Sequence, residues 1–326
     1  MSEQLPQRIE ALRSAVYPSF ALLAGMQLDL FTALAAVPLT ASQLAAATHT
    51  DAHRLRVLLY ALVNAGLLTV EDECFANTAE ADHYLVHGRE GSMLERHHLW
   101  SELWRALSHT ADPIRDGRPL ARKDFATMPA AELRSFFSGL HPNAIAEGRE
   151  FAARFDAVDH SPVVDVAGGS GGFAIGLTQA LPQLAVTVVD LPQVIPHTRY
   201  FIEQADAASR VSVEAADLVD GTLRGNFGAA MLRNFIQVLA PDQIARALAC
   251  VRAALRPGAI LYISGDILDD SRQSPADTVA FNLVFVNIYE AGQAYTEMEY
   301  CHWLSAAGFV GIERLGEDLM RARRPA

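Results

Sequence analysis

The feature that most constrains the fold is a series of short apolar runs, alternating with helical patterns, that begins near residue 162. Helical patterns start at Gly171, follow Pro192 and span residues 241–255. Strands that alternate with helices form a mostly parallel sheet with right-handed crossovers. We therefore predict an α/β domain that ends in an antiparallel hairpin of residues 310–314 and 319–323. The predicted parallel strands lie at residues 163–167, 185–189, 210–213, 229–232 and 259–263.

The first 90 residues show a different order, in which three helical segments precede a short hairpin. Thr40 and Gln43 have the spacing of a capping box, and Asp51 precedes an amphipathic pattern that Gly66 ends. This order is typical of a winged-helix module. Its predicted elements are one long amphipathic helix over residues 18–36, a helix from Thr40 through Ala47, a helix from Asp51 to Gly66, and a hairpin over residues 67–76.

Charge argues against DNA binding by this module. Residues 1–90 contain five arginines, no lysine and ten acidic residues, whereas a DNA-binding module is basic along its recognition helix. The whole chain has 26 basic and 38 acidic residues and a formal net charge of −12, which repels phosphate backbones and anionic lipids. We expect no nucleic acid or membrane partner, and we expect the front module to pack against a second copy in a homodimer.

The cysteines and the N-terminus bear on the compartment. Cys74, Cys250 and Cys301 form no CxxC spacing, so the sequence indicates neither a disulfide framework nor a zinc site, and we expect buried, reduced thiols. The N-terminus lacks the apolar core of a secretion signal, and Gln27 and Asp29 interrupt the most apolar early stretch. A cytoplasmic protein without a metal is therefore expected.

Residues 91–155 are predicted to be helical throughout and to bridge the front module to the α/β part. The predicted domains are therefore 1–90, 91–155 and 156–326. The bridge contains several histidines and aromatic residues, although each histidine, taken singly, is better explained by packing or surface exposure than by ligand binding. The histidines considered are His97, His98 and His141, together with His302 farther along the chain.

Residues 163–172, VVDVAGGSGG, form the sharpest local signal. An apolar strand ends near an acid and turns through glycines into a helix, which lets a ligand approach bare backbone at a helix N-terminus. From Gly169 onward the string GSGGFA also matches the dinucleotide pattern GxGxxG/A. A nicotinamide or flavin enzyme therefore remains an alternative for this loop on its own.

Three aspartates favour an adenosyl ligand without phosphates. Asp165 precedes the glycines, where a carboxylate suits a cationic ligand better than a pyrophosphate. Asp190 ends the second strand, where an acid can hold ribose hydroxyls. Asp217 follows the third strand and could accept a hydrogen bond from an adenine amine. The alternative is that each aspartate only caps a helix or turn.

Five strings together resemble the S-adenosylmethionine-dependent small-molecule O-methyltransferases, a family that includes plant caffeate and bacterial antibiotic-pathway enzymes. They are VVDVAGGSGG (163–172), VVDLPQVI (188–195), AADL (215–218), LRNFIQVL (232–239) and RPGAILYISGDIL (256–268). The resemblance implies a winged-helix dimerisation domain, a Rossmann-like methyltransferase domain, S-adenosyl-L-methionine as cofactor and S-adenosyl-L-homocysteine as product. It places Gly168 and Gly169 at the methionine end of the cofactor, Asp190 and Leu191 at the ribose, Asp217 and Leu218 at the adenine, and Arg233 beside the adenosyl group.

The sequence departs from the family's pattern at the general base. The family has a histidine in a string like LHDW, and the aligned residues here are IleGlnValLeu, which place Gln237 at the histidine position. Two glutamates that orient the histidine in plant relatives would fall near Gly265 and Ala294. Ala167 replaces the first glycine of the family's triplet, which the turn tolerates if the φ angle of Ala167 stays negative.

Glutamine cannot accept a proton near neutral pH, but methyl transfer from a sulfonium mainly needs alignment, close approach and exclusion of water. We therefore predict methyl transfer to a nitrogen, a carbon or an acidic hydroxyl of a small aromatic or conjugated secondary metabolite. A protein that binds the cofactor but catalyses hydroxylation or a pericyclic step, or that serves as a ligand sensor, remains an alternative. The predicted catalytic residues are Gln237 and Asp266, and the predicted acceptor contacts are His97, Trp100, His141, Asn282, Phe285 and Tyr289.

Overall fold

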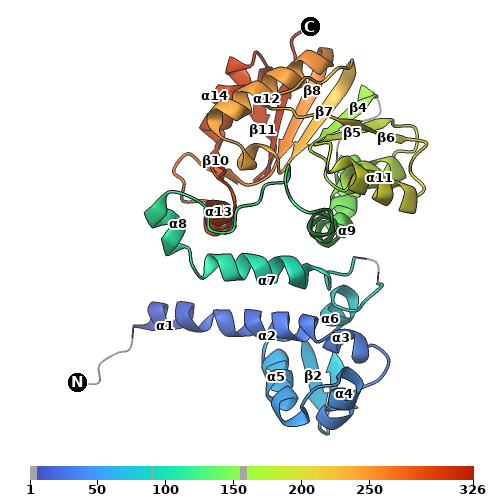
Figure 1. The fold of residues 1–326 in the computed structure, drawn as a ribbon, viewed down its shortest axis with the longest axis vertical. Coiled ribbons are helices and arrows are strands. Elements are labelled where there is room, and N and C mark those ends of the chain that lie inside the picture. The colour runs from blue at the N-terminus through green and yellow to red at the C-terminus, as the bar shows by residue number, and fades with distance from the viewer. Residues whose placement is uncertain (1–5, 90, 155–159) are drawn as a thin grey trace. The chain divides into compact units, whose positions relative to one another are not determined.

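The computed structural model of the chain describes residues 6–89, 91–154 and 160–326 (Figure 1). The chain divides into two compact units, Met1–Ser101 and Glu102–Ala326. The predicted domain limits at residue 90 and between residues 155 and 156 fall outside the described residues, so the division into three domains stays a prediction.

The first unit contains the expected helices and hairpin, but its first long helix is broken. The sequence predicts one helix over residues 18–36, whereas α2 ends at Gln27 and α3 begins at Leu30. Asp29 lies between them with a φ of 52°, in the left-handed region. The break turns Leu30 and Phe31 into the core, where both are fully buried, so the single-helix prediction is wrong. The elements are α1 (Gln7–Ser14), α2 (Val16–Gln27), α3 (Leu30–Ala33), β1 (Leu39–Thr40), α4 (Ala41–Thr48), α5 (Ala52–Asn64), β2 (Leu68–Glu71), β3 (Cys74–Asn77) and α6 (Ala79–Tyr84).

The predicted helix caps are confirmed. Thr40 N donates to Gln43 Oε1 at 2.9 Å and Gln43 N donates to Thr40 Oγ1 at 3.3 Å, which closes the capping box of α4. Arg54 N donates to Asp51 Oδ1 at 2.9 Å at the start of α5. The predicted hairpin forms from β2 and β3, and β1 adds to it in the order β1-β3-β2.

The expectation of an all-helical bridge is only partly met. Helix α7 (Arg96–Leu107), α8 (Ala111–Asp116) and α9 (Ala130–Arg154) form, but residues 117–129 contain no helix. Gly117, with a φ of 68°, ends α8. Ala121 N and Lys123 N then donate to the carbonyls at the C-terminal end of α13 (Ala276–Ile288) at 3.0 and 2.8 Å. The stretch therefore runs along α13 instead of coiling.

Seven strands of the second unit form one sheet in the order β11-β12-β8-β7-β4-β5-β6. The pairs from β8 to β6 are parallel, and β12 and β11 join antiparallel, which confirms the predicted sheet and C-terminal hairpin. The strands are β4 (Val163–Val166), β5 (Val186–Asp190), β6 (Val211–Ala215), β7 (Phe227–Arg233), β8 (Leu255–Ser264), β11 (Val310–Arg314) and β12 (Leu319–Arg323), with a separate pair β9 (Ile267–Leu268) and β10 (Tyr295–Thr296). The helices are α10 (Gly172–Ala180), α11 (Ile195–Gln204), η2 (Ile236–Val238), α12 (Pro241–Ala254), α13 (Ala276–Ile288) and α14 (Glu297–Ala306).

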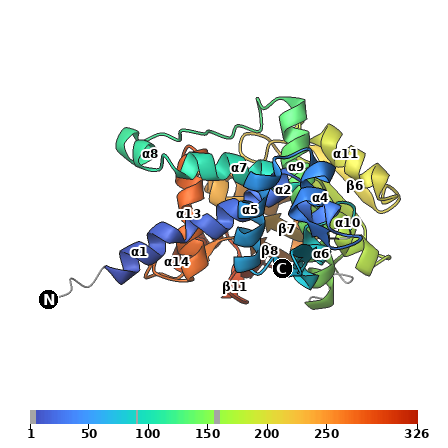
Figure 2. The same cartoon turned by 90° about the horizontal axis from the view of Figure 1, so that it is seen from below.

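Each face of the sheet has its own hydrophobic core because side chains alternate along the strands. Val164 and Val166 pack with α12 and α14 on one face, and Val163 packs with α9, α10 and α11 on the other. In both views α13 and α14 lie toward one end of the sheet and α11 toward the other (Figures 1 and 2). The carboxyl ends of the parallel strands meet at one edge, where ligands bind in sheets of this kind.

Candidate active site

The turn between β4 and α10 has an unusual backbone. Ala167, Gly169 and Gly171 have φ angles of 54°, 57° and 71°, so the expectation that Ala167 keeps a negative φ is wrong. Ala167 N donates to Val189 O at 2.7 Å, and this bond to the neighbouring strand β5 holds the residue in the left-handed region. Holding alanine there costs about 1 kcal/mol, and such strain persists only where the surroundings over-determine it.

Helix α9 packs closely on this turn and on α10. A Cβ atom built on Gly172 would lie 2.8 Å from Ala144 Cβ, and one built on Gly169 would lie 2.7 Å from the ring of Phe137. The two helices therefore cross with almost no side chain between their backbones. This crossing places Phe137 and His141 of α9 directly against residues 169 and 170 of the turn.

Asp190, at the end of β5, holds the turn from the other side. Its Oδ2 accepts a hydrogen bond from Gly169 N and its Oδ1 accepts one from Leu191 N, both at 2.7 Å. Burial raises the pKa of Asp190 to about 6, although the two backbone hydrogen bonds act to lower it. Each carboxylate oxygen keeps a further acceptor position, so Asp190 can still accept hydrogen bonds from ligand hydroxyls.

Asp165 is a fully buried carboxylate beside the same turn. Neither of its oxygens has a hydrogen-bond partner among the described residues. Burial raises the pKa of Asp165 to about 7, while nearby Arg233 lowers it and Asp190 raises it further. A buried, unpartnered carboxylate needs an explanation, and the predicted role of Asp165 in cofactor binding stays a prediction.

The other predicted cofactor residues are only partly brought together. Asp217 Oδ1 accepts hydrogen bonds from Val219 N at 2.8 Å and Asp220 N at 3.3 Å, so it caps its own turn. Leu218 is buried in the core, and Leu191 packs partly buried next to Asp190. Arg233 lies at the end of β7 beside Asp165, where its guanidinium donates to Glu147 Oε2 of α9 at 2.8 Å. The cofactor roles of these residues stay predictions.

Gln237 and Asp266, the two predicted catalytic residues, contact each other. Gln237 Nε2 donates to Asp266 Oδ2 at 3.1 Å and to Asn234 Oδ1 at 3.2 Å. Asp266 N donates back to Gln237 Oε1 at 3.4 Å. Burial raises the pKa of Asp266 to about 6, and the charge of Asp318 raises it further. This carboxyl group can therefore take up or release a proton near neutral pH, which an amide cannot.

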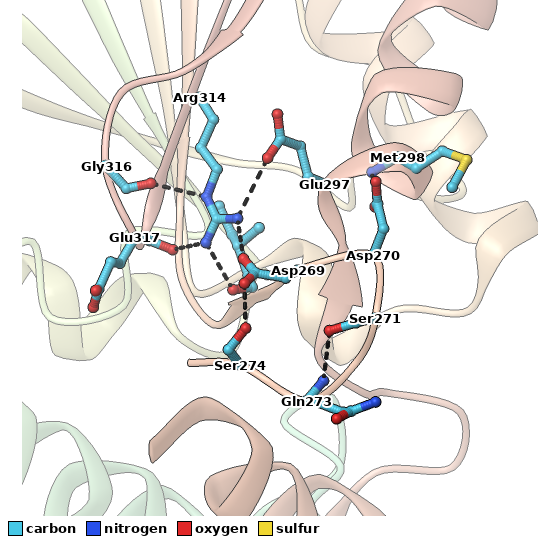
Figure 3. Close-up of polar contacts among 11 residues, drawn as sticks. Asp269, Asp270, Ser271, Gln273, Ser274, Glu297, Met298, Arg314, Gly316 and Glu317 are labelled. Atoms are coloured by element: carbon cyan, nitrogen blue, oxygen red, sulfur yellow. Dashed lines mark hydrogen bonds and ion pairs between the residues drawn. The ribbon is translucent and has the colours of Figure 1, made fainter. Parts of the chain in front are cut away.

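The loop after β9 is fixed to the sheet by Arg314 (Figure 3). Arg314 donates to Asp269 Oδ1 at 2.9 Å, to Glu297 Oε2 at 3.4 Å and to three backbone carbonyls at 2.7–3.2 Å. Asp269 Oδ2 also accepts from the hydroxyl of Ser274, which closes the loop. Because this loop leads from Asp266 into α13, Arg314 sets the position of both.

Helix α13 presents an apolar wall close to Gln237. Phe285 and Tyr289 pack in a small cluster with Leu268 and Ala294, and a Cβ atom on Gly292 would touch both Tyr289 Cβ and Gln237 O. Burial raises the pKa of Tyr289 to about 12, so its hydroxyl stays protonated. Asn282 on the same helix has a structural contact, since its Oδ1 accepts from Ala294 N at 2.8 Å.

The histidines fall in separate places. His97 and Trp100 lie on α7 in the first unit, where burial lowers the pKa of His97 and its ring packs 3.9 Å from that of His98. His141 contacts the glycine turn in the second unit, and His302 is exposed on α14. Their acceptor roles stay predictions. Among residues 6–89, 91–154 and 160–326, no group of three or more His, Cys, Asp and Glu side chains is arranged to hold a metal ion.

Two predictions from composition can be compared with the described part of the chain. Cys74, Cys250 and Cys301 are free thiols, but they are half-buried and not fully buried as expected. No helix within the described ranges is long and apolar enough to cross a membrane.

Comparison with protein-family models gives a match over most of the chain. A model of the O-methyltransferase domain matches residues 122–310, more than half of the sequence, and a model of the O-methyltransferase dimerisation domain matches residues 11–87. This chain belongs to the O-methyltransferase family. As a member of that family it is a methyltransferase of the S-adenosylmethionine-dependent class, and its dimerisation domain supports a homodimer.

Curated relatives of this O-methyltransferase include two Streptomyces enzymes. The 3-hydroxy-5-methyl-1-naphthoate 3-O-methyltransferase of Streptomyces sahachiroi is 28% identical over 93% of this chain and 89% of its own. The tetracenomycin polyketide synthesis 8-O-methyl transferase TcmO of Streptomyces glaucescens is 27% identical over 94% of this chain and 92% of its own. Both similarities extend across the two units.

Solved structures show the same fold. Human N-acetylserotonin methyltransferase in complex with SAM superimposes with a TM-score of 0.88 at 23% identity, over 100% of this chain and 99% of that one. The structure of PigF with SAH superimposes with a TM-score of 0.85 at 20% identity, over 98% of this chain and 100% of that one. The predicted fold class is thereby confirmed.

Three residues that hold the site were missed from the sequence. Thr198 Oγ1 donates to Gly169 O at 2.6 Å, Glu147 pairs with Arg233, and Arg314 fixes the loop before α13. Glu147 of α9 and Thr198 of α11 lie at ordinary helix positions, so nothing in the sequence marks either residue. The signal for Arg314 was weak: an acidic pair, Asp269 and Asp270, lies much earlier in the sequence and could pair with a basic residue.

Proposed function

We propose that this O-methyltransferase binds S-adenosylmethionine at the turn between β4 and α10 and methylates a small aromatic or conjugated secondary metabolite. The observation that carries the proposal is the pair of buried carboxylates, Asp165 and Asp190, beside a turn with three residues of positive φ. A carboxylate without a partner suits the cationic methionine part, and Asp190 suits ribose hydroxyls. We assign Gly168, Gly169, Leu191, Asp217, Leu218 and Arg233 to the same site.

The protein's own contribution is to bind, align and exclude water. When bound, S-adenosylmethionine supplies a methyl group activated by its sulfonium. Tyr289, which is only partly buried, offers aromatic surface against which a flat acceptor can pack, and the buried ring of Phe285 packs beside it. Alignment in a dry site supplies a large part of the rate for an in-line displacement, so a histidine base is unnecessary for an amine, a carbon nucleophile or an acidic hydroxyl.

The relatives support an aromatic acceptor without fixing the atom that is methylated. Two act on hydroxyl groups of a naphthoate and of a polyketide, by their names. A third, 8-amino-8-demethylriboflavin N,N-dimethyltransferase of Streptomyces davaonensis, is 28% identical over 96% of this chain and acts on an amine, by its name. Both kinds of acceptor therefore belong in the assay.

Where the acceptor is a hydroxyl, Asp266 is the candidate for its proton. Its raised pKa lies near 6, and Gln237 holds one of its oxygens. Below pH 6 the carboxyl becomes protonated and cannot accept a proton, so the rate should fall as the pH drops. Asp266→Asn should remove this acid limb, whereas Gln237→His should keep methyl transfer.

The test measures S-adenosylhomocysteine formation with a panel of aromatic amines, naphthols and acidic enols, together with calorimetric binding of S-adenosylhomocysteine. We expect binding by the wild type, about tenfold or more weaker binding by Asp190→Ala, and turnover with at least one acceptor class. Binding without turnover on the whole panel would favour the non-methylating enzyme or sensor. Unchanged affinity in Asp190→Ala would refute the ribose assignment.

A further inference from the structure

His141 of α9 is connected by hydrogen bonds to the backbone of the glycine turn. His141 Nδ1 lies 2.9 Å from Ser170 Oγ, and Ser170 Oγ accepts a hydrogen bond from Gly172 N at 3.3 Å. Ser170 is buried. A hydrogen-bond network of three groups therefore connects the imidazole through the hydroxyl to the backbone N–H of Gly172, the first residue of α10.

Only one hydrogen bond of this network has a fixed direction, since Gly172 N can only donate. A serine hydroxyl has one hydrogen and two acceptor positions, so Ser170 Oγ can either donate to His141 Nδ1 or accept from it, according to the tautomer of the imidazole. Either tautomer keeps the two side chains hydrogen-bonded to each other. Burial lowers the pKa of His141 to about 4, which keeps the imidazole neutral.

Packing holds the imidazole in place on its other sides. Its ring stacks on Phe201 of α11, with centroids 4.2 Å apart and an angle of 23° between the planes. The α9 backbone at His141 lies so close to Gly172 that a Cβ atom there would be 2.9 Å from His141 O. The ring therefore has little freedom to leave Ser170.

We propose that His141 is a positioning residue for the cofactor turn. Through its hydrogen bond with the Ser170 hydroxyl it holds Ser170 over the first N–H group of α10 and so supports the strained turn that begins at Ala167. The proposal rests on the proposed function, since it assumes that S-adenosylmethionine binds at this turn. It also means that helix α9, whose His141 is a predicted acceptor contact, is tied directly to the cofactor turn.

Calorimetric binding of S-adenosylhomocysteine tests this role without knowledge of the acceptor. His141→Phe keeps an aromatic ring on Phe201 but removes the ring nitrogen, and Ser170→Ala removes the hydroxyl. His141→Asn retains an amide that can accept or donate a hydrogen bond close to the position of Nδ1. We expect about five- to tenfold weaker binding for His141→Phe and for Ser170→Ala, and recovery to within about threefold for His141→Asn.

The double variant distinguishes positioning from two unrelated losses. If the two residues act as one unit, His141→Phe with Ser170→Ala should bind no worse than the weaker single variant. Losses that multiply, or a lower melting temperature with unchanged affinity in all variants, would overturn the proposal. If His141→Phe does not fold, Ser170→Ala and His141→Asn still decide the question.

The wild type separates this inference from the proposed function. Failure of the wild type to bind S-adenosylhomocysteine would refute the proposed function itself. Binding by the wild type, loss in Asp190→Ala and wild-type affinity in His141→Phe would refute only the role of His141.

Discussion

A side chain on Gly265 would collide with Gln237, because a Cβ atom built there overlaps the position of Gln237 Oε1. The backbone of Gly265 has a φ of 155°, and the amide of Gln237 lies across it to reach Asp266. Two of the three positions at which this chain departs from the family's catalytic pattern, Gln237 and Gly265, are therefore coupled sterically. A glutamine that bonds Asp266 in this way requires a glycine at position 265.

Gly265→Ala should destabilise the protein by about 1–3 kcal/mol, since the new methyl group forces Gln237 out of its hydrogen bonds. The effect should be smaller in a Gln237→Ala background, where the overlapping oxygen is gone. Urea denaturation of the two single variants and the double variant measures this coupling. Additive losses would show that the two residues are independent.

Ala167→Gly should stabilise the fold by about 0.5–1 kcal/mol, because glycine adopts a φ of 54° without the steric penalty of a Cβ atom. The gain is reduced by the greater freedom of glycine in the unfolded chain. Ala180→Gly, near the end of α10, is a control at a helical position and should destabilise instead. A loss of stability in both variants would contradict the strain at Ala167.

The sequence predicted what local chemistry and chain order determine. Thr40, Gln43 and Asp51 predict where helices begin, because each makes a short-range hydrogen bond at a helix N-terminus. The valine-rich runs predict a buried parallel sheet. The helix break at Asp29 could not be predicted from local sequence. The left-handed conformation of Asp29 is selected by the burial of Leu30 and Phe31, which depends on tertiary packing.

The site was predictable as a set of strand ends but not as a set of contacts. The sequence predicts Gln237 and Asp266 as catalytic residues, yet their mutual hydrogen bond depends on the missing side chain of Gly265. Likewise the sequence predicts His141 as an acceptor contact, whereas its hydrogen bond to Ser170 depends on how closely α9 crosses α10. Backbone distances of this kind leave no periodic signal.

Arg314→Met should lower the free energy of unfolding by about 2 kcal/mol through the loss of three hydrogen bonds to backbone carbonyls. The loop before α13 should then loosen, which raises the KM for an acceptor while leaving the affinity for S-adenosylhomocysteine unchanged. Arg246→Met is the matched control, since Arg246 pairs with Asp242 at an exposed site and should change stability by less than about 1 kcal/mol. Equal effects of both variants on stability and KM would contradict the role of Arg314.

Asp165 should make the unliganded protein less stable as the pH rises. Its pKa is raised to about 7 in the folded state by burial, from a usual 3.8, so the folded state binds a proton more tightly than the unfolded state. The stability that this proton gives is present below about pH 4 and is lost as the pH rises through 7. The amide of Asp165→Asn does not ionise, so this variant should not show the loss of stability that the ionisation of Asp165 causes.

Asp190 and Asp266, both with pKa values raised to about 6, titrate in the same window, so the informative quantity is the difference between Asp165→Asn and the wild type. We expect this difference in unfolding free energy to grow from near zero at pH 4 to on the order of 2–4 kcal/mol at pH 8 in favour of the variant. S-adenosylhomocysteine has no sulfonium but keeps the ammonium group of its amino-acid part, so it should bind the same variant more weakly, because the amide attracts this ammonium less than a carboxylate does. A variant that is less stable than the wild type at pH 8 would contradict the cost of burying the Asp165 charge. A variant that binds S-adenosylhomocysteine as tightly as the wild type would refute the contact between Asp165 and a cationic ligand group.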